Sequence, residues 1–268
     1  MSLRVAAIGL TSGVDLRHNL DACESQLRAA QAAGASLCLL PENFAGMGAG
    51  FDRRSIAESW QQPGPILQRM QRLARELKLT IVLGGMPEHE SGAPPYNTAF
   101  VLGEEGQLLA TYRKVHLFDA DVSDGTAYRE SQNTSAGIAP QLFSWRGMQV
   151  GLSICYDLRF PELYRELRKQ GAGLLLVPAA FTAPTGEAHW QVLLRARAIE
   201  NQCFVLAAAQ GGVHPGGRRT YGHSQLVGPW GNVLTEAHTH EQVLVHELDQ
   251  GELVRVRAEM PVEAHRRL

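Results

Sequence analysis

A cysteine lies where an apolar run gives way to charged residues, in the segment VGLSICYDLRFPELYREL (150–167). The alternating apolar residues before it are typical of a strand, and Pro161 is typical of the first turn of a helix. Cys155 is therefore predicted to follow a strand, at the start of a loop. A free cysteine in such a place is either a small core residue or a nucleophile whose thiolate is stabilised by a nearby base or positive charge.

Two other chemically capable side chains also follow predicted strands. Glu42 comes after the apolar run SLCLL and a proline, and Lys114 lies in ATYRKVHLFD, just after a predicted hairpin. Strand ends in an α/β sheet converge on one rim, where sites usually form. A Glu–Lys–Cys cluster can carry out acyl transfer, because the carboxylate takes the thiol proton and the ammonium stabilises the oxyanion. The backbone N–H of Tyr156 can complete an oxyanion hole.

The segments that must position these residues alternate between strand and helix, which predicts the α/β class. The first half contains predicted strands at 3–10, 36–42 and 80–85, predicted helices at 16–33 and 65–77, and a hairpin that turns at 104–106.

The second half repeats this order and part of the sequence. Residues 34–44 match 171–181, residues 80–86 match 203–209, and residues 96–109 match 221–234. A repeat longer than 100 residues is too long for a solenoid. It predicts two similar halves, each a sheet faced by helices and related by a pseudo-two-fold axis. No linker-like segment separates the halves, so we expect one domain over residues 1–268.

The repeat also singles out Glu42, because its counterpart in the second half is Ala179. The fold therefore does not require a carboxylate after this strand. A chemical role explains Glu42 better, and partial burial would adjust its pKa toward that of a general base.

Composition limits the possible partners and location. The 268 residues are 44% hydrophobic and 19% charged, with a formal net charge of −2. These values are typical of a globular protein and predict neither a nucleic-acid nor a membrane partner. The four cysteines lack zinc spacing and favour a reducing compartment. The apolar run at the N-terminus is too short for a signal peptide, so we expect a cytoplasmic protein.

Three blocks, LPENF, YRKVHLFD and SICYDLRFPELYR, resemble in order and spacing the signature blocks of the nitrilase (carbon–nitrogen hydrolase) superfamily. The resemblance extends from about residue 4 to residue 250. It implies a four-layer αββα sandwich of two pseudo-symmetric halves. It also implies Cys155 as nucleophile, Glu42 as base, Lys114 as oxyanion stabiliser and Glu130, in AYRESQ, as a second glutamate. No cofactor is implied, and the family commonly forms dimers, for which the helices predicted at 161–170 and 187–201 are candidates.

The segments after residue 180 resemble the branch that contains deaminated glutathione amidases, with the omega-amidases as the alternative. Both branches share the TG-x-x-HW feature, but omega-amidases usually carry ATASP-like residues where this chain has AAAQ (207–210). The resemblance implies hydrolysis of the γ-amide bond in a small carboxylate-bearing substrate. A true nitrilase is disfavoured, since its cysteine block is typically Cys-Trp-Glu. A non-enzymatic interaction protein is disfavoured because all four catalytic residues are intact.

Candidate substrate-binding residues have structural alternatives. Arg159 is expected first to form a local ion pair with Asp157, and alternatively its planar guanidinium can bind a substrate carboxylate. Phe181 and Thr182 follow a strand on the same rim as Glu42 and either line the pocket or simply pack. His189 and Trp190 are predicted near the start of a helix, mainly in a structural role.

The glycine-rich stretch GGVHPGGRR (211–219) is predicted to be a mobile lid rather than a phosphate-binding loop, because no strand–loop–helix context surrounds it. Its Arg218 and Arg219 can bind the far carboxylate of a substrate that is anionic at both ends. The HxH pair at His238 and His240 has no third ligand at metal spacing, and we expect no metal site.

Overall fold

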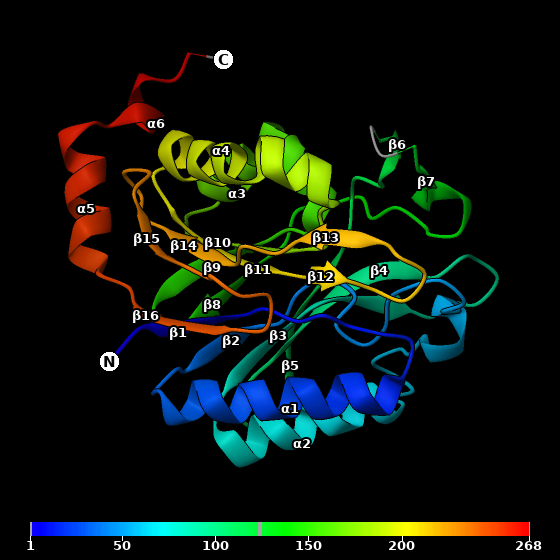
Figure 1. The fold of residues 1–268 in the computed structure, drawn as a ribbon. Helices are drawn as coiled ribbons and strands as arrows, with labels where there is room; N and C mark the ends of the chain where they lie inside the picture. Colours follow the sequence, from blue (N-terminus) through cyan, green and yellow to red (C-terminus); the bar gives the residue numbers. More distant parts are fainter. Residues whose placement is uncertain (1, 123–124, 268) are drawn as a thin grey trace.

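The computed structural model describes residues 2–122 and 125–267 and contains two six-stranded sheets between two pairs of helices (Figure 1). The first sheet has the spatial order β16 (Val243–Glu247), β1 (Arg4–Ile8), β2 (Leu37–Leu39), β3 (Thr80–Glu88), β4 (Tyr96–Leu102) and β5 (Leu108–Arg113). The second has the order β15 (Val233–Glu236), β14 (Gln225–Val227), β11 (Phe204–Ala209), β10 (Ala172–Ala179), β9 (Met148–Leu152) and β8 (Leu142–Trp145).

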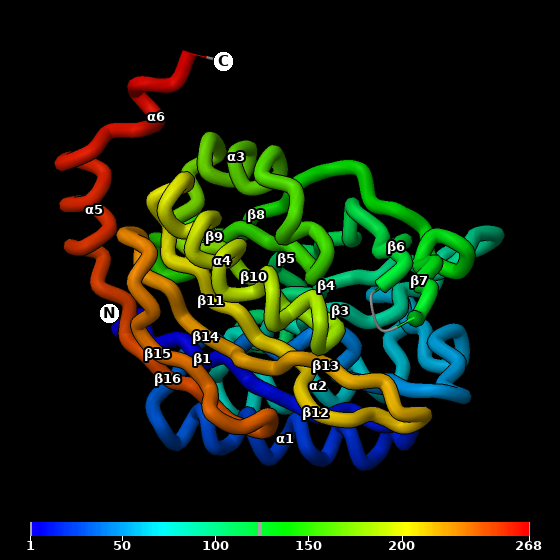
Figure 2. The backbone as a smooth tube through the Cα atoms, turned by 45° about the horizontal axis from the view of Figure 1, so that its top comes forward, coloured from blue at the N-terminus to red at the C-terminus, as the bar shows by residue number. Residues whose placement is uncertain are grey.

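Helices cover the outer face of each sheet. α1 (Leu16–Ala32) and α2 (Pro65–Leu77) lie under the first sheet, and α3 (Pro161–Lys169) and α4 (Ala183–Asn201) lie over the second (Figure 1). α5 (Gln250–Glu259) and α6 (Val262–His265) extend from one edge, as Figure 2 shows. No described helix is long and apolar enough to cross a membrane. The predicted αββα sandwich is confirmed.

The two halves have the same topology. Read from opposite edges, β16-β1-β2-β3-β4-β5 corresponds to β8-β9-β10-β11-β14-β15, and every pair of neighbours has the same parallel or antiparallel sense in both sheets. The sequence repeat therefore predicted the pseudo-symmetry correctly. β16 comes from the end of the chain yet pairs with β1, so the last strand completes the first sheet (Figure 2).

The cores follow from the strand sequences. The parallel strands are buried on both faces and read as continuous apolar runs, such as AGLLLVPA in β10, where every residue is buried. One core lies between the sheets and beneath α3 and α4, and a second lies between the first sheet and α1 and α2. This packing fixes the strand ends that carry the polar side chains.

Several predicted boundaries were wrong by a few residues. The strand predicted at 36–42 is only Leu37–Leu39, because the chain turns out of the sheet before Pro41. α4 starts at Ala183 rather than Glu187, since Thr182 occupies the N-cap and Pro184 fits the first turn. α2 has the predicted bounds.

Short elements surround the strand ends. They are the 3-10 helices η1 (Arg53–Ile56), η2 (Glu130–Gln132) and η3 (Cys155–Arg159), the hairpin of β6 (Asp119–Asp121) and β7 (Ala127–Arg129), and the hairpin of β12 (Gly211–Val213) and β13 (Arg219–Tyr221).

Candidate active site

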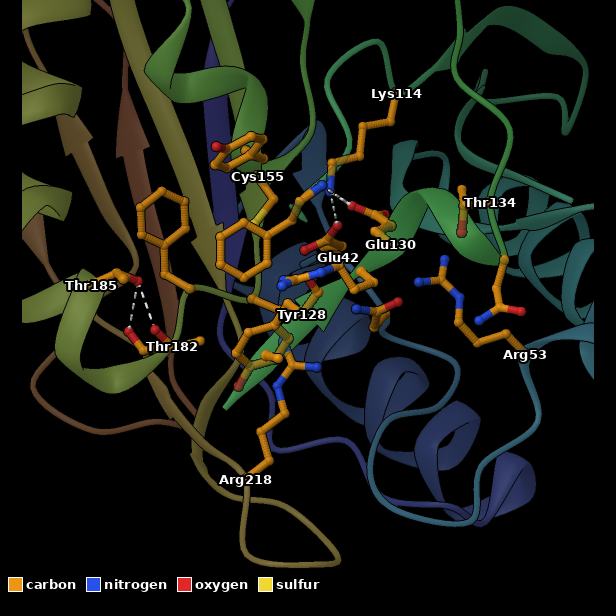
Figure 3. Close-up of a pocket in the computed structure, with 18 of the residues that line it drawn as sticks. Glu42, Arg53, Lys114, Tyr128, Glu130, Thr134, Cys155, Thr182, Thr185 and Arg218 are labelled. Carbon is orange, nitrogen blue, oxygen red and sulfur yellow. Dashed lines mark hydrogen bonds and ion pairs between the residues drawn. The ribbon is translucent and has the colours of Figure 1, made fainter. Parts of the chain in front are cut away.

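The structure brings the three residues predicted at strand ends together with Glu130. The Lys114 Nζ atom lies 3.0 Å from Glu42 Oε1 and 2.8 Å from Glu130 Oε2, and Lys114 is only 1% exposed. Figure 3 shows the two carboxylates converging on this ammonium, with Cys155 beside Glu42. Glu130 also accepts a hydrogen bond of 2.7 Å from the backbone N–H of Phe118. The arrangement is a buried ion cluster with one cation and two anions.

The charges in this cluster stabilise one another. Burial disfavours the charged form of Lys114, but the carboxylates of Glu130 and Glu42 outweigh burial and raise its pKa above the ordinary value. Burial also works against the Glu130 carboxylate, yet the positive charges of Lys114 and Arg53 hold its pKa below the ordinary value. Lys114 is therefore a fixed cation at neutral pH, suited to stabilising an oxyanion rather than to exchanging protons.

Cys155 is the first residue of η3 and has a strained backbone, with φ = 51°. It is 8% exposed and lines the pocket. Burial raises the pKa of its thiol well above the ordinary value and the Glu42 carboxylate raises it further, while Lys114 and the backbone N–H of Ala180 oppose the rise. The thiol is therefore protonated at rest, and it can become a nucleophile only if a nearby base such as the Glu42 carboxylate takes its proton.

Asp157 organises the loop around the cysteine. It is fully buried and accepts hydrogen bonds from the Tyr112 hydroxyl at 2.7 Å and the Ile154 backbone N–H at 2.8 Å; its carboxylate also lies 2.8 Å from His116 Nδ1. The predicted ion pair between Asp157 and Arg159 is therefore wrong. Arg159 lies in the pocket wall instead, where its Nη1 is 3.2 Å from His189 Nδ1.

A cavity of about 290 Å³ opens above the thiol. Its wall contains four arginines, Arg53, Arg129, Arg159 and Arg218, against the two glutamates, Glu42 and Glu130. Lys114 compensates part of the negative charge of Glu42 and Glu130. The four arginines therefore give the cavity lining a net positive charge. Such a pocket suits a small substrate with more than one carboxylate.

Most predicted binding residues lie in this wall. Tyr156, Arg159, Phe181, Thr182 and Arg218 all line the cavity. Arg219 does not: it is exposed on β13, where strand alternation turns its side chain away from that of Arg218.

The glycine-rich stretch is a hydrogen-bonded hairpin rather than the expected mobile loop. His214 is buried within it, with Nδ1 2.8 Å from the Ser12 carbonyl oxygen and Nε2 2.6 Å from Thr220 Oγ1. Ala49 N–H donates to the Pro215 carbonyl oxygen at 2.8 Å. These contacts fix the hairpin to loops of the first half and position Arg218 at the pocket.

His189 and Trp190 lie in the second turn of α4 rather than at its start. Trp190 donates a 2.8 Å hydrogen bond to the His223 carbonyl oxygen and packs on Phe181, with ring centroids 5.0 Å apart. Both residues thus support pocket residues from behind. Among residues 2–122 and 125–267, no group of three His, Cys, Asp or Glu side chains is arranged to hold a metal.

Sequence reasoning missed several polar residues of the site, among them Arg53, Thr185 and Asn97. Arg53 lines the cavity from η1, and Thr185 lines it from the first turn of α4. Asn97, on β4, contacts both glutamates. Asn97 resembles any polar residue at the start of a strand, and Arg53 lies in a segment without periodicity. Tyr96 and Asn97 could be recognised as the start of the hairpin, but nothing in their spacing indicates that Asn97 contacts Glu42.

Comparison with known proteins fits this geometry. A sequence model of the family described as "Carbon-nitrogen hydrolase" matches residues 4–258. The chain belongs to this family. A protein from Synechocystis sp. named deaminated glutathione amidase is 44% identical over 265 residues, covering 97% of each chain. A human protein of the same name is 40% identical over 274 residues, covering 98% of this chain and 82% of its own.

Solved structures of the nitrilase superfamily have the same fold. The C. elegans NitFhit protein superposes with a TM-score of 0.91 at 37% identity, covering 99% of this chain and 65% of that one. Saccharomyces cerevisiae Nit3 superposes with a TM-score of 0.89 at 30% identity, covering 100% of this chain and 97% of that one. The chain is a carbon–nitrogen hydrolase with the Glu–Lys–Cys arrangement at its pocket.

Proposed function

We propose that this carbon–nitrogen hydrolase is a cysteine-dependent amidase that cleaves the γ-amide bond of deaminated glutathione, releasing α-ketoglutarate and Cys-Gly. The observation that carries the proposal is the buried Glu42–Lys114–Glu130 cluster beside Cys155, at the floor of a cavity walled by arginines. The relatives of this name, 39–44% identical over nearly the whole chain, support the choice of substrate.

In the first step the Glu42 carboxylate takes the proton from Cys155 as the sulfur attacks the amide carbonyl carbon. The carbonyl π electrons move to oxygen, and the oxyanion is stabilised by the Lys114 ammonium and the Tyr156 N–H. The C–N bond then breaks, and Glu42 returns the proton to the leaving amine of Cys-Gly. The acyl group remains on Cys155 as a thioester.

In the second step a water molecule takes the place of the departed amine. Glu42 accepts a proton from this water as its oxygen attacks the thioester carbonyl, and Lys114 again stabilises the oxyanion. The C–S bond breaks, the sulfur regains a proton and α-ketoglutarate leaves. In this mechanism Glu130 holds the Lys114 ammonium in place through their 2.8 Å ion pair.

Substrate recognition rests on the arginine wall. Arg159 lies four residues after the nucleophile, with its guanidinium carbon 5.2 Å from the centroid of the Phe181 ring, so it is placed to bind the carboxylate of the acyl part. Arg218 lies over the Tyr128 ring, and its buried Nε has no hydrogen-bond partner in the described structure. We assign Arg218 to the glycine carboxylate of the leaving dipeptide, which α-ketoglutaramate lacks.

The test compares kcat/KM for deaminated glutathione and α-ketoglutaramate in the wild type, Arg218→Ala and Arg219→Ala. We expect the wild type to prefer the longer substrate and Arg218→Ala to lose about tenfold or more of that preference, because a charge-assisted pair is lost. Arg219→Ala is the matched control, since its exposed side chain lies outside the cavity. A wild-type preference for α-ketoglutaramate would instead make the protein an omega-amidase.

We also propose that the protein is a cytoplasmic homodimer formed by one domain. The four cysteines are free, which suits a reducing compartment. Val192 and Ile199 are exposed on α4, and Ile199 lines a shallow pocket together with the exposed Trp230. Sedimentation of the wild type and Val192→Asp tests the dimer: the variant should shift toward monomer, and a monomeric wild type would contradict it.

A further inference from the structure

We propose that Asn97 is a positioning residue that selects the oxygen of Glu42 that acts as the base and fixes that carboxylate beside Glu130. The inference rests on the proposed amidase mechanism, since it specifies how the base of that mechanism is prepared. No family motif quoted above includes Asn97. It acts through Glu42 and does not line the cavity.

The amide of Asn97 donates to both carboxylates. Its Nδ2 lies 2.9 Å from Glu42 Oε1 and 3.3 Å from Glu130 Oε1, and the residue is completely buried. The reverse orientation would place the amide oxygen against two carboxylate oxygens. The hydrogen-bond network therefore determines that Nδ2, and not Oδ1, faces the carboxylates. The Oδ1 atom has no partner and faces Gly85, where an added Cβ would lie only 2.8 Å away.

Two donors occupy the same oxygen of Glu42. Its Oε1 accepts from Asn97 at 2.9 Å and from Lys114 at 3.0 Å. A carboxylate oxygen has two lone pairs in its plane, so these donors saturate Oε1. Oε2 is therefore the oxygen left to receive the Cys155 proton. If Asn97 were absent, Oε1 would retain only Lys114, and the carboxylate could rotate and offer either oxygen.

Asn97 also compensates charge. Two buried carboxylates share one close ammonium, and like charges in one site normally drive one of them to take up a proton. The N–H groups of Asn97 favour the ionised form of both. Four charged or titratable groups surround Glu42 from the packed elements: Lys114 after β5, Glu130 in η2, Cys155 in η3 and Arg53 in η1. Of these four groups only Lys114 donates to Oε1 of Glu42, so Asn97 is the source of the second hydrogen bond to that oxygen.

The experiment measures the pH dependence of kcat/KM in Asn97→Ala and Asn97→Asp. Loss of the donor should move the acid limb of kcat/KM to higher pH in Asn97→Ala, because an N–H hydrogen bond favours an ionised carboxylate. The shift should be larger in Asn97→Asp, which adds a third carboxylate. We expect kcat at neutral pH to fall about 10–100-fold while KM changes little, as for other residues that orient a catalytic group.

Thr98→Val is the matched control. Thr98 is the next residue on β4, is equally buried and donates a 2.8 Å hydrogen bond to Glu88 on the other side of the strand. Its loss should lower the melting temperature without moving the acid limb. All rates are divided by the folded fraction from near-UV circular dichroism, so a loss of stability in an Asn97 variant does not imitate a catalytic effect.

Iodoacetamide alkylation of Cys155 provides a second readout that needs no substrate. The acid limb of alkylation should shift in the order Asn97→Asp, then Asn97→Ala, with Thr98→Val equal to wild type. Unshifted limbs in folded Asn97 variants, or an equal shift in Thr98→Val, would overturn the inference. If the wild type fails to hydrolyse deaminated glutathione yet the alkylation limbs shift as expected, the substrate assignment falls and the role of Asn97 stands.

Discussion

The two halves of the molecule use one strand end in different ways. In the first half β2 stops at Leu39, and the chain turns out of the sheet so that Glu42 reaches the pocket. In the second half the equivalent strand β10 continues to Ala179, which pairs with Ala209 of β11. The same Gly-Ala-x-Leu pattern thus leads to a cavity-lining carboxylate in one half and to a paired strand residue in the other. The two halves therefore share one scaffold and differ at this strand end in whether a carboxylate is present.

A second pair of equivalent positions shows the same division. Asn97 corresponds in the sequence repeat to Gly222, which has φ = 75°. A Cβ at Gly222 would lie 2.8 Å from His240 Nδ1, so this glycine makes room for the histidine ring. In the first half the corresponding side chain is present and contacts Glu42. The two corresponding positions therefore differ in whether a polar side chain reaches the cluster beside Cys155.

The largest expected effect is a loss of turnover that distinguishes two buried cysteines of the second half, Cys155 and Cys203. Cys155→Ala should abolish turnover and leave the fold intact, because alanine fits the small space at the start of η3. Cys203→Ala should leave the chemical step nearly unchanged, since burial raises the pKa of Cys203 to about 11 and its thiol contacts the Ala172 carbonyl oxygen. Steady-state rates and circular dichroism on both variants measure the difference.

A Cys155→Ala variant that retained even about a tenth of wild-type activity would rule out the cysteine mechanism, because none of the other described residues that line the cavity can form the thioester.

The next effect tests why the first half kept its carboxylate. Glu42→Gln preserves size but cannot accept the thiol proton, so kcat should fall by about 10²–10⁴-fold. Lys114→Met should be similarly damaging because the oxyanion loses its cation. Glu88→Gln is the control: Glu88 is a buried glutamate of the same sheet, paired with Arg113 at 2.7 Å and outside the cavity.

Glu88→Gln should lose stability and retain its rate per folded molecule. If Glu42→Gln changed KM alone, Glu42 would be a substrate-binding residue and the base would have to be found elsewhere.

The sequence was informative where local patterns determine structure. Pro65 and an amphipathic run set the bounds of α2, and Glu42, Lys114 and Cys155 stood out because each follows a strand whose end faces the same rim. Contacts between distant segments were not predictable. Asp157 was assigned to Arg159 two residues away, whereas burial selects Tyr112, 45 residues earlier.

The prediction of a mobile lid at residues 211–219 was wrong for the same reason. Its glycines suggested mobility, but the buried contact between His214 and Ser12, 202 residues apart, fixes it. Local composition does not reveal such a partner.

The smallest expected effect is a change in the pH dependence of stability. It concerns the contact between His214 and Ser12, which joins the two halves. Burial lowers the pKa of His214, and the charges of Arg218 and His240 lower it further, against the raising effect of the Ser12 carbonyl oxygen. A folded histidine that resists protonation contributes stability above the pKa of its unfolded form, near 6.5. That contribution is lost as the pH falls below this value, because the unfolded chain takes up a proton more readily than the folded one.

The measurement is the drop in melting temperature between about pH 7.5 and about pH 5.5, compared between wild type and His214→Gln. We expect the drop to be larger in the wild type, because acid removes the stability that neutral His214 contributes to the folded chain. His18→Gln, an exposed site on α1, is the control and should keep the wild-type drop. An equal drop in all three proteins would show that His214 does not contribute to the pH dependence of stability. A larger drop in the wild type would show that protonation of His214 destabilises the folded chain. Because His214 joins the hairpin that carries Arg218 to Ser12, we then expect binding of the longer substrate to weaken in acid.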